Sequence, residues 1–356
     1  MLRKTIISSA FAFATLASMA QTEVEPFVPG STLEGISYYL PQTALRVTVE
    51  AEKTITTPGD FNKYAFNYMR LQNVPGDVST KWEIKSIKLE PFGVPDKTKA
   101  YSIKLKSKTS APLVGLSHDG ILLSINTDAQ EEVLPELPKG QAAPKPVNPR
   151  DFMTQEILSA GSTAKMAELC AQEVYDIRES KNALVRGEAD NTPKDGAQLK
   201  LMLDQLDQQA NALESLFKGT QQTSTEIFSF NYVPKAETDK ELLFRFSEKL
   251  GKVENDDLAG APIYVSVKNM ETLPTAQENE QTSKKKEKIE RGIYYNVPSR
   301  TKITVFTPQK EYAVLETPMG QFGSVEILSS ILFDKKMTTQ VTFFQSTGGK
   351  KRMMDL

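Results

Sequence analysis

The feature that most constrains this chain is a pair of segments, within residues 148–219, that carry matched signals for the start and the end of a helix. The first opens with Asn148-Pro149 and the second with Thr192-Pro193. In each, a capping side chain precedes proline at the first helical position. The segments end at Arg186-Gly187 and Lys218-Gly219, and a cation followed by glycine is typical of a helix C-terminus. The sequence therefore predicts an antiparallel helical hairpin.

The first segment is too long to match its partner without an interruption. At 1.5 Å per residue it would span about 57 Å from Pro149 to Arg186, against about 39 Å for the second segment. The stretch Ala160-Gly161-Ser162-Thr163 offers a break, because glycine is costly inside a helix and serine can cap a new one. A helix that restarts at Ser162 spans about 38 Å. We therefore expect a short helical piece and then a matched hairpin.

Apolar residues recur at helical spacing in both segments and form stripes. The second segment has a leucine-rich stripe and a neighbouring one: Leu199, Met202, Leu206, Leu213 and Leu216, then Leu203, Ala210 and Phe217. The first has a small-residue stripe with larger residues beside it: Ala164, Ala167, Ala171 and Val174, then Leu169, Cys170, Ile177 and Leu184. Small residues allow close approach, so we expect this seam to pack against the leucine-rich stripe. The remaining stripes need a cover: the β regions of a compact monomer, which we prefer, or another chain.

The first twenty residues have the features of a signal peptide. Arg3-Lys4 precedes an apolar run over residues 6–19, and Ala20 precedes Gln21. The run is too short to span a membrane, and small residues stand at the cleavage position. The residue directly after that position is Gln21 and not a cysteine, which disfavours a lipoprotein. We expect the mature protein to be exported and soluble in the periplasm or cell envelope, with no transmembrane segment.

Charge and cysteine content exclude several classes of partner and stabilising link. Lysine and arginine number 43 and aspartate and glutamate 45, a net charge of −2, so no nucleic-acid partner is expected. Cys170 is the only cysteine, so no disulfide can form within the chain. Because Cys170 lies on the apolar side of a predicted helix, we interpret it as a core residue.

The regions on either side of the helices show strand patterns. Residues 21–134 contain alternating apolar positions, one short helical pattern at 61–69 and a hairpin turn at Ser117-His118-Asp119-Gly120. A proline-rich connector covers residues 135–147, and short alternating segments fill residues 220–356. The expected fold class is α+β, with two mainly antiparallel, sandwich-like β lobes joined by the long helical hairpin.

A short internal echo links the two β regions. Residues 35–41, Gly-Ile-Ser-Tyr-Tyr-Leu-Pro, align with residues 292–298, Gly-Ile-Tyr-Tyr-Asn-Val-Pro. With an offset of one residue, Val47-Thr48-Val49 then aligns with Ile303-Thr304-Val305. Related lobes and common strand composition both explain a match of this length.

With these segments in view, the chain resembles an uncharacterised family of exported bacterial proteins, catalogued only as a domain of unknown function. The resemblance rests on Gly161-Ser162-Thr163-Ala164-Lys165-Met166-Ala167-Glu168, Ile177-Arg178-Glu179-Ser180, Leu199-Lys200-Leu201-Met202-Leu203, Val114-Gly115-Leu116-Ser117 and Asp119-Gly120-Ile121-Leu122. It covers most of the mature chain and implies this architecture and export. It brings no catalytic residues.

Residue counts and spacing exclude much chemistry. His118 is the sole histidine, so a multi-histidine metal site is excluded and any histidine-dependent triad would need it. No glycine-rich phosphate loop appears. Neither Asp256-Asp257 nor the pair Glu278 and Glu280 has calcium-loop spacing. The stretch 284–288 is basic, and we favour a solvated loop over a phosphate site. We predict no catalytic residue, cofactor or metal.

Carboxylate chemistry stays open, because two nearby acids suffice for glycoside hydrolysis and no spacing reveals them. Four tyrosines have side chains that can stack on sugar rings, although strands favour tyrosine in any case: Tyr38, Tyr39, Tyr294 and Tyr295. One polar cluster of the first helix is either a polar site or, more simply, a solvated helix face: Arg178, Glu179 and Lys181. We expect a periplasmic binding or scaffold protein without catalytic activity, with an envelope protein or a carbohydrate as partner. The alternative is a carboxylate-dependent carbohydrate-active enzyme.

Overall fold

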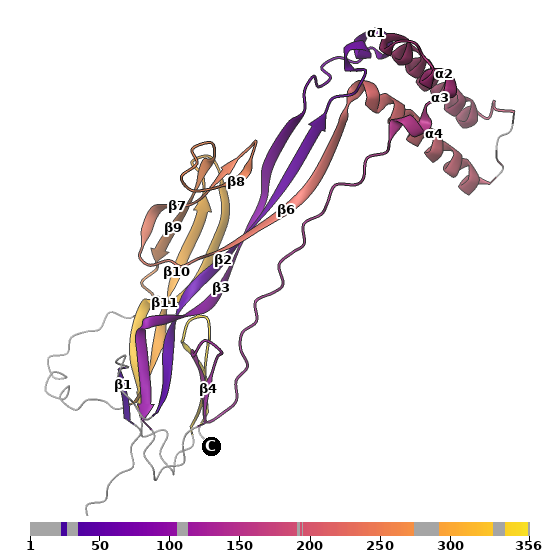
Figure 1. The fold of residues 1–356 in the computed structure, drawn as a ribbon. Coiled ribbons are helices and arrows are strands. Elements are labelled where there is room, and N and C mark those ends of the chain that lie inside the picture. The colour runs from indigo at the N-terminus through magenta and orange to yellow at the C-terminus, as the bar shows by residue number, and fades with distance from the viewer. Residues whose placement is uncertain are drawn as a thin grey trace, which may run out of the picture.

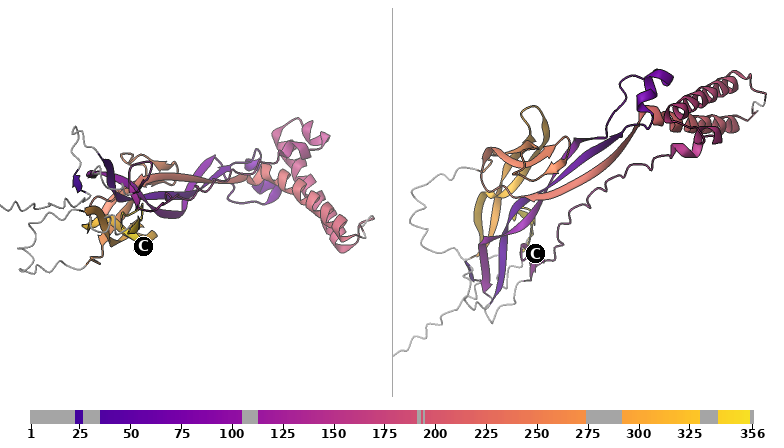
Figure 2. Two further views of the ribbon diagram at one scale, coloured as in Figure 1. Left: turned by 90° about the horizontal axis from the view of Figure 1, so that it is seen from below. Right: turned by 45° about the horizontal axis from the view of Figure 1, so that its top comes forward.

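The computed structural model describes residues 23–26, 35–104, 113–190, 193, 195–273, 292–329 and 339–354. The chain is elongated: β sheets form a base at one end, and helices form a head at the other (Figure 1). The ends of three long strands connect the two (Figure 2). The predicted signal peptide (residues 1–20), the basic stretch 284–288, and Glu278 with Glu280 lie outside the described residues.

The long strands are β2 (Ile36–Thr57), β3 (Ser79–Lys104) and β6 (Thr220–Tyr232). With β1 (Glu23–Pro26) they form an antiparallel sheet in the order β1-β3-β2-β6. We call residues 50–57, 79–86 and 220–227 of these strands the arm. Thr56 pairs with Ser79, and Thr57 pairs with Thr220. All three strands therefore meet the head at the same end.

A second antiparallel sheet has the order β11-β10-β9-β7-β8. Its strands are β7 (Thr238–Ser247), β8 (Gly251–Val253), β9 (Ala261–Asn269), β10 (Gly292–Phe306) and β11 (Glu311–Ser329). Its buried residues, such as Phe244, Val265 and Ile303, share one apolar core with Val47 and Trp82 of the first sheet. The predicted α+β class with antiparallel sheets is confirmed.

A third, smaller sheet has the order β13-β12-β5-β4. Its strands are β4 (Val114–Leu116), β5 (Leu122–Ile125), β12 (Gln340–Phe343) and β13 (Lys350–Met354). Strand β12 pairs with β5, just as β6 pairs with β2. Residues 21–134 and 220–356, which the sequence analysis treats as two lobes, therefore share two sheets. Alternation of apolar residues marks a strand but not its partner.

The two echo segments meet in the base. They begin β2 and β10, and the Tyr38 hydroxyl donates to the Tyr294 carbonyl oxygen at 3.2 Å and accepts from the Tyr294 N–H at 2.9 Å. Each strand shifts its register next to its proline, between Tyr39 and Pro41 in β2 and between Val297 and Ser299 in β10. The repeated residues thus begin two strands that contact each other in the base, and in each strand the proline accompanies a shift of register.

The head consists of η1 (Asn62–Tyr64), α1 (Ala65–Met69), η2 (Pro149–Phe152), α2 (Gln155–Leu158), α3 (Thr163–Arg186) and α4 (Gly196–Lys218). The predicted restart at Ser162 is confirmed, since its hydroxyl accepts from the Lys165 N–H at the start of α3. Both helices end at the predicted glycines, Gly187 and Gly219, with φ of 73° and 77°. The predicted start of α4 at Thr192-Pro193 is wrong, because Asp195 caps it. Thr192 itself lies outside the described residues.

The half of the head nearest the arm has a packed core. Buried Ala167, Ala171 and Val174 of α3 share it with Leu213 and Leu216 of α4. The second stripe is covered in this half by the short helical part of the β region 21–134 and by α2: Phe61, beside η1, lies against Phe217 with ring centroids 5.5 Å apart, and Ile157 of α2 joins the same cluster. The leucine-rich stripe is buried only in part, because Met202 is 37% exposed.

The proline-rich connector, residues 135–147, runs from the base to the head beside β6 (Figures 1 and 2). Gln141 forms a bridge with Thr225, and the Pro135 carbonyl accepts from the Arg46 guanidinium at 2.7 Å. A Cβ at Gly140 would lie 2.5 Å from the Thr225 carbonyl oxygen, so only glycine fits there. The connector is mostly exposed, and these contacts tie it to the arm at Thr225 and to the base at Arg46.

Candidate functional site

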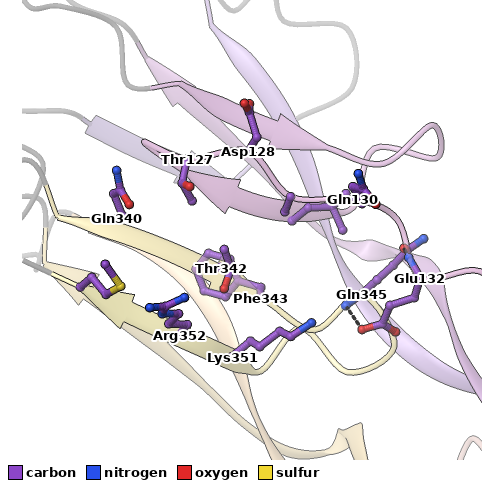
Figure 3. Close-up of a pocket in the computed structure, with 13 residues that line it drawn as sticks. Thr127, Asp128, Gln130, Glu132, Gln340, Thr342, Phe343, Gln345, Lys351 and Arg352 are labelled. Carbon is purple, nitrogen blue, oxygen red and sulfur yellow. Dashed lines mark hydrogen bonds between the residues drawn. The ribbon is translucent and has the colours of Figure 1, made fainter.

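Two places on the described surface each combine a hollow with side chains whose polar groups or apolar surface are not used in packing the fold. One is a cavity of about 620 Å³ on the small sheet of the base, which we call the basal cavity (Figure 3). The other is a groove of about 760 Å³ between the far ends of α3 and α4, which we call the head groove. Both volumes lie in the range of ligand pockets, roughly 300–1,000 Å³.

The basal cavity lies between β12 and β13 on one side and residues 127–132 on the other. Most of its lining residues are polar, and the lining consists of Leu123, Thr127, Asp128, Ala129, Gln130, Glu132, Gln340, Thr342, Phe343, Gln345, Lys351, Arg352 and Met354. Leu123 and Phe343 are the buried apolar residues of this lining.

Glu132 fixes the wall made by residues 127–132. Its carboxylate accepts from the backbone N–H groups of Gln345 and Ser346, both at 3.1 Å. Its own N–H donates to the Gln345 side-chain oxygen at 2.7 Å. This carboxylate is therefore committed to holding the wall and is a poor candidate for a catalytic acid.

The head groove has an apolar floor and an open mouth. Its lining consists of Ser180, Ala183, Leu184, Glu188, Ala189, Asp190, Leu201, Met202, Gln205 and Leu206. Leu201 is 59% exposed, and Val185, beside the lining, is 63% exposed. Glu188 and Asp190 are the charged residues of this lining, so its described rim is acidic.

The predicted turn at residues 117–120 is confirmed, and His118 lies on its exposed side. Gly120 has a φ of 79°, and its N–H donates to the Ser117 carbonyl at 2.9 Å. His118 Nδ1 lies 2.8 Å from a Glu131 oxygen, and its Nε2 lies 3.2 Å from Asp119. The hydrogen bond with Glu131 and the nearby charge of Asp119 raise the pKa of His118.

Cys170 is far from this histidine, because it belongs to the core of the head. Burial raises the pKa of its thiol to about 12, with a further contribution from Glu173. The thiol is therefore protonated at neutral pH, and no cysteine–histidine pair forms.

The tyrosines with side chains suited to sugar stacking serve mainly as packing residues. Tyr38 is fully buried, and the rings of Tyr101 and Tyr294 stack with centroids 4.3 Å apart. Tyr295 is nearly buried and donates to Glu326 at 2.9 Å. Tyr39 lies against Gly120 of the turn. They do not form an open platform.

The polar cluster of α3 serves mainly to join the two helices. Arg178 pairs with Glu214 at 2.7 Å, and Lys181 pairs with Asp207. Glu179 is not part of these pairs and lines a shallow hollow with Tyr175.

The described carboxyl groups with a shifted pKa offer no support for an acid catalyst. Hydrogen bonds from basic partners lower the pKa values of Glu90, Glu131 and Glu214, against burial where it opposes them, whereas a general acid needs a raised pKa. Asp257 accepts from the Ala259 N–H in a turn. Within the described ranges, no three His, Cys, Asp or Glu side chains gather as metal ligands would.

Neither hollow was predicted from the sequence. The signal at the basal cavity was the run Lys350-Lys351-Arg352, but only the strand register shows where these cations lie. At the head, Leu201 falls outside the predicted stripes. Such a residue could have indicated a surface that the fold itself leaves open.

Residues 34–351 match the family described as a domain of unknown function, DUF4831. The chain belongs to this family. The DUF4831 match includes the head and nearly all of the base, and it ends inside β13. Comparison with curated proteins and with solved structures finds no match. Among the helices described, none has the length and apolar character that a membrane crossing requires.

Proposed function

We propose that this chain is an exported, non-catalytic scaffold protein whose head groove binds an amphipathic helix of a partner protein in the cell envelope. The finer architecture belongs to the proposal: a sandwich-like base, and an antiparallel hairpin of α3 and α4 that forms the binding head. The observation that carries it is the uncovered groove between the far ends of these helices.

The groove exposes apolar side chains to solvent, and this exposure does not stabilise the fold. Leu201 and Met202 are 59% and 37% exposed, although the same helices bury Leu213 completely. Leaving apolar surface in water costs about 25 cal/mol per Å². Exposed apolar surface of this kind at the far end of the head supports an interaction site there.

The occupant that fits is a helix with an apolar face and basic flanks. A helix in a groove places residues at every third or fourth position against an apolar floor. The described rim carries Glu188 and Asp190, so lysine or arginine beside the apolar face would complement it.

Location enters the proposal through residues 1–20. Their basic start, short apolar run and small residue before Gln21 favour export. A partner in the periplasm or envelope would then meet the head at the end of the arm.

A synthetic amphipathic helix of leucine and lysine tests the groove. We expect it to bind the wild-type protein in fluorescence anisotropy and to lose about tenfold or more in affinity with Leu201→Glu, because that change places charge in the apolar floor. Leu258→Glu is the matched control, since Leu258 is 82% exposed in a turn of the base.

A leucine–glutamate helix should bind more weakly than the leucine–lysine helix. Equal binding of the two peptides, or unchanged binding by Leu201→Glu, would contradict the proposal. Light scattering adds one outcome: a wild-type dimer that Leu201→Glu converts to a folded monomer would make a second copy of the chain the occupant instead.

A further inference from the structure

We propose that the basal cavity is a binding site for an acidic saccharide, that is, a sugar that carries a carboxylate. This site lies in the base, and it is independent of the head groove and of its partner. The inference rests on how the cavity is held open, on a bulge that gathers two cations, and on unused hydroxyl and amide groups.

The cavity is preformed. Both carboxylate oxygens of Glu132 accept backbone N–H groups of the turn after β12. The same segment is tied at Glu131, which accepts from the His118 N–H at 2.7 Å, and at Pro135, whose carbonyl accepts from Arg46. A ligand would therefore enter a hollow of about 620 Å³ without first having to order its wall.

A β-bulge places two neighbouring cations on the cavity. In a regular strand, Lys351 and Arg352 would point to opposite faces. Thr342 pairs with Arg352, but Phe343 pairs with Lys350, so Lys351 is the extra residue of β13. Lys351 and Arg352 consequently both line the cavity (Figure 3). Bulges redirect side chains in this way, often beside functional sites.

These cations are not used by the fold. Within the described ranges, neither Lys351 nor Arg352 has an ion-pair partner, and Lys351 only approaches the Phe344 ring, at 5.4 Å. The charge of Glu132 is already met by two N–H groups. Asp128 is exposed on the other wall, across from Arg352 (Figure 3). The β13 wall therefore favours a carboxylate, which guanidinium binds through two hydrogen bonds.

The rest of the lining suits hydroxyl groups. Thr127, Thr342, Gln130 and Gln340 line the cavity, and their side chains form no hydrogen bond with any described residue. Hydroxyl and amide groups both donate and accept, as sugar hydroxyls do. Asp128 can accept further hydroxyls. A carboxylate beside Lys351 and Arg352, with hydroxyls along the threonine and glutamine side chains of both walls, together describe an acidic saccharide.

Calorimetric titration with three probes tests the proposal: digalacturonate, the neutral disaccharide maltose, and inorganic phosphate. We expect digalacturonate to bind, and maltose and phosphate to bind at least about tenfold more weakly, because each lacks one half of the recognition. Maltose binding as tight as digalacturonate would overturn the role of charge. Phosphate binding as tight would leave a simple anion site and would overturn the saccharide.

Variants locate the site. Arg352→Gln should weaken digalacturonate binding by about tenfold or more, and Lys350→Gln, which removes the same charge from the same strand outside the cavity lining, should leave it unchanged. Arg352 is exposed, so circular dichroism and thermal unfolding should match the wild type. Should Arg352→Gln fail to fold, Lys351→Gln decides instead. Equal affinities of the cavity variant and Lys350→Gln would refute the proposal.

Discussion

The two halves of the head are built from the same two helices, but the near half is buried and the far half is exposed. Near the arm, α3 and α4 bury a core with residues of η1, α1 and α2, and Leu213 is 0% exposed. At the far end no other described element packs over the same two helices, and Leu201 is 59% exposed. Apolar residues at helical spacing therefore do not predict burial; the elements that pack over the helix decide it.

The largest test of this comparison is a pair of leucines in α4. Leu213→Ala should lower the free energy of unfolding by about 2–5 kcal/mol, because it leaves a cavity in a packed core. Leu201→Ala should change it by no more than about 0.5 kcal/mol, as an exposed substitution does. Chemical denaturation measures both. Similar losses in the two variants would show that the far half is as well packed as the near half.

A pair of glycines tests the contact between arm and head at a smaller scale. A Cβ at Gly59 would lie 2.1 Å from the Leu216 carbonyl oxygen, where the chain leaves β2. Gly59→Ala should therefore destabilise the protein by about 1–3 kcal/mol through overpacking.

Gly161, in the break before α3, is the matched control, because nothing lies within 4 Å of an added Cβ there. Gly161→Ala should leave the unfolding free energy within about 0.5 kcal/mol of the wild type. A tolerated Gly59→Ala would indicate that the near half of the head is not pressed against the arm.

The smallest expected effect concerns the ion pairs between the helices. Burial alone would raise the pKa of Glu214, but hydrogen bonds from Arg178 and Lys218 lower it overall. A carboxyl group with a lowered folded-state pKa stabilises the fold above its unfolded pKa, about 4.3. That stability is lost as the pH falls through the folded value.

Thermal unfolding between pH 7 and pH 3 checks this sign. The wild type should lose more stability over that range than Glu214→Gln, which cannot titrate at this position. Parallel curves for the two proteins would mean that the Arg178–Glu214 pair does not hold the near halves of α3 and α4 together in solution.

Local sequence signals predicted much of the head correctly. The Ser162 cap, the ends at Gly187 and Gly219 and the break around Gly161 all act within one turn of the helix. Asp195 was missed because Thr192-Pro193 offers a second, equally good start three residues earlier. The interhelical seam was predicted only in part, since no third element among the described residues lies over its far end.

The strands were harder to predict than the helices. Two apolar runs, within residues 82–89 and 101–103, belong to the one strand β3, which continues between them through Pro91 and Pro95. Proline usually interrupts a strand interior. Here Pro95 lies opposite Pro41, at the point where the β2–β3 register shifts. Pairing along the rest of the ladder therefore maintains the strand.

By itself, the sequence determined the α+β class, the antiparallel habit of the strands, the family and most helix boundaries, because caps, turns and periodicity act over a few residues. Only the tertiary structure decided that β6 pairs with β2, although the helices of the head lie between them in the sequence. It likewise decided that β12 pairs with β5. It also decided which half of the head is covered and that a bulge turns Lys351 and Arg352 to one cavity. These features depend on partners distant in the chain, which no local pattern can specify.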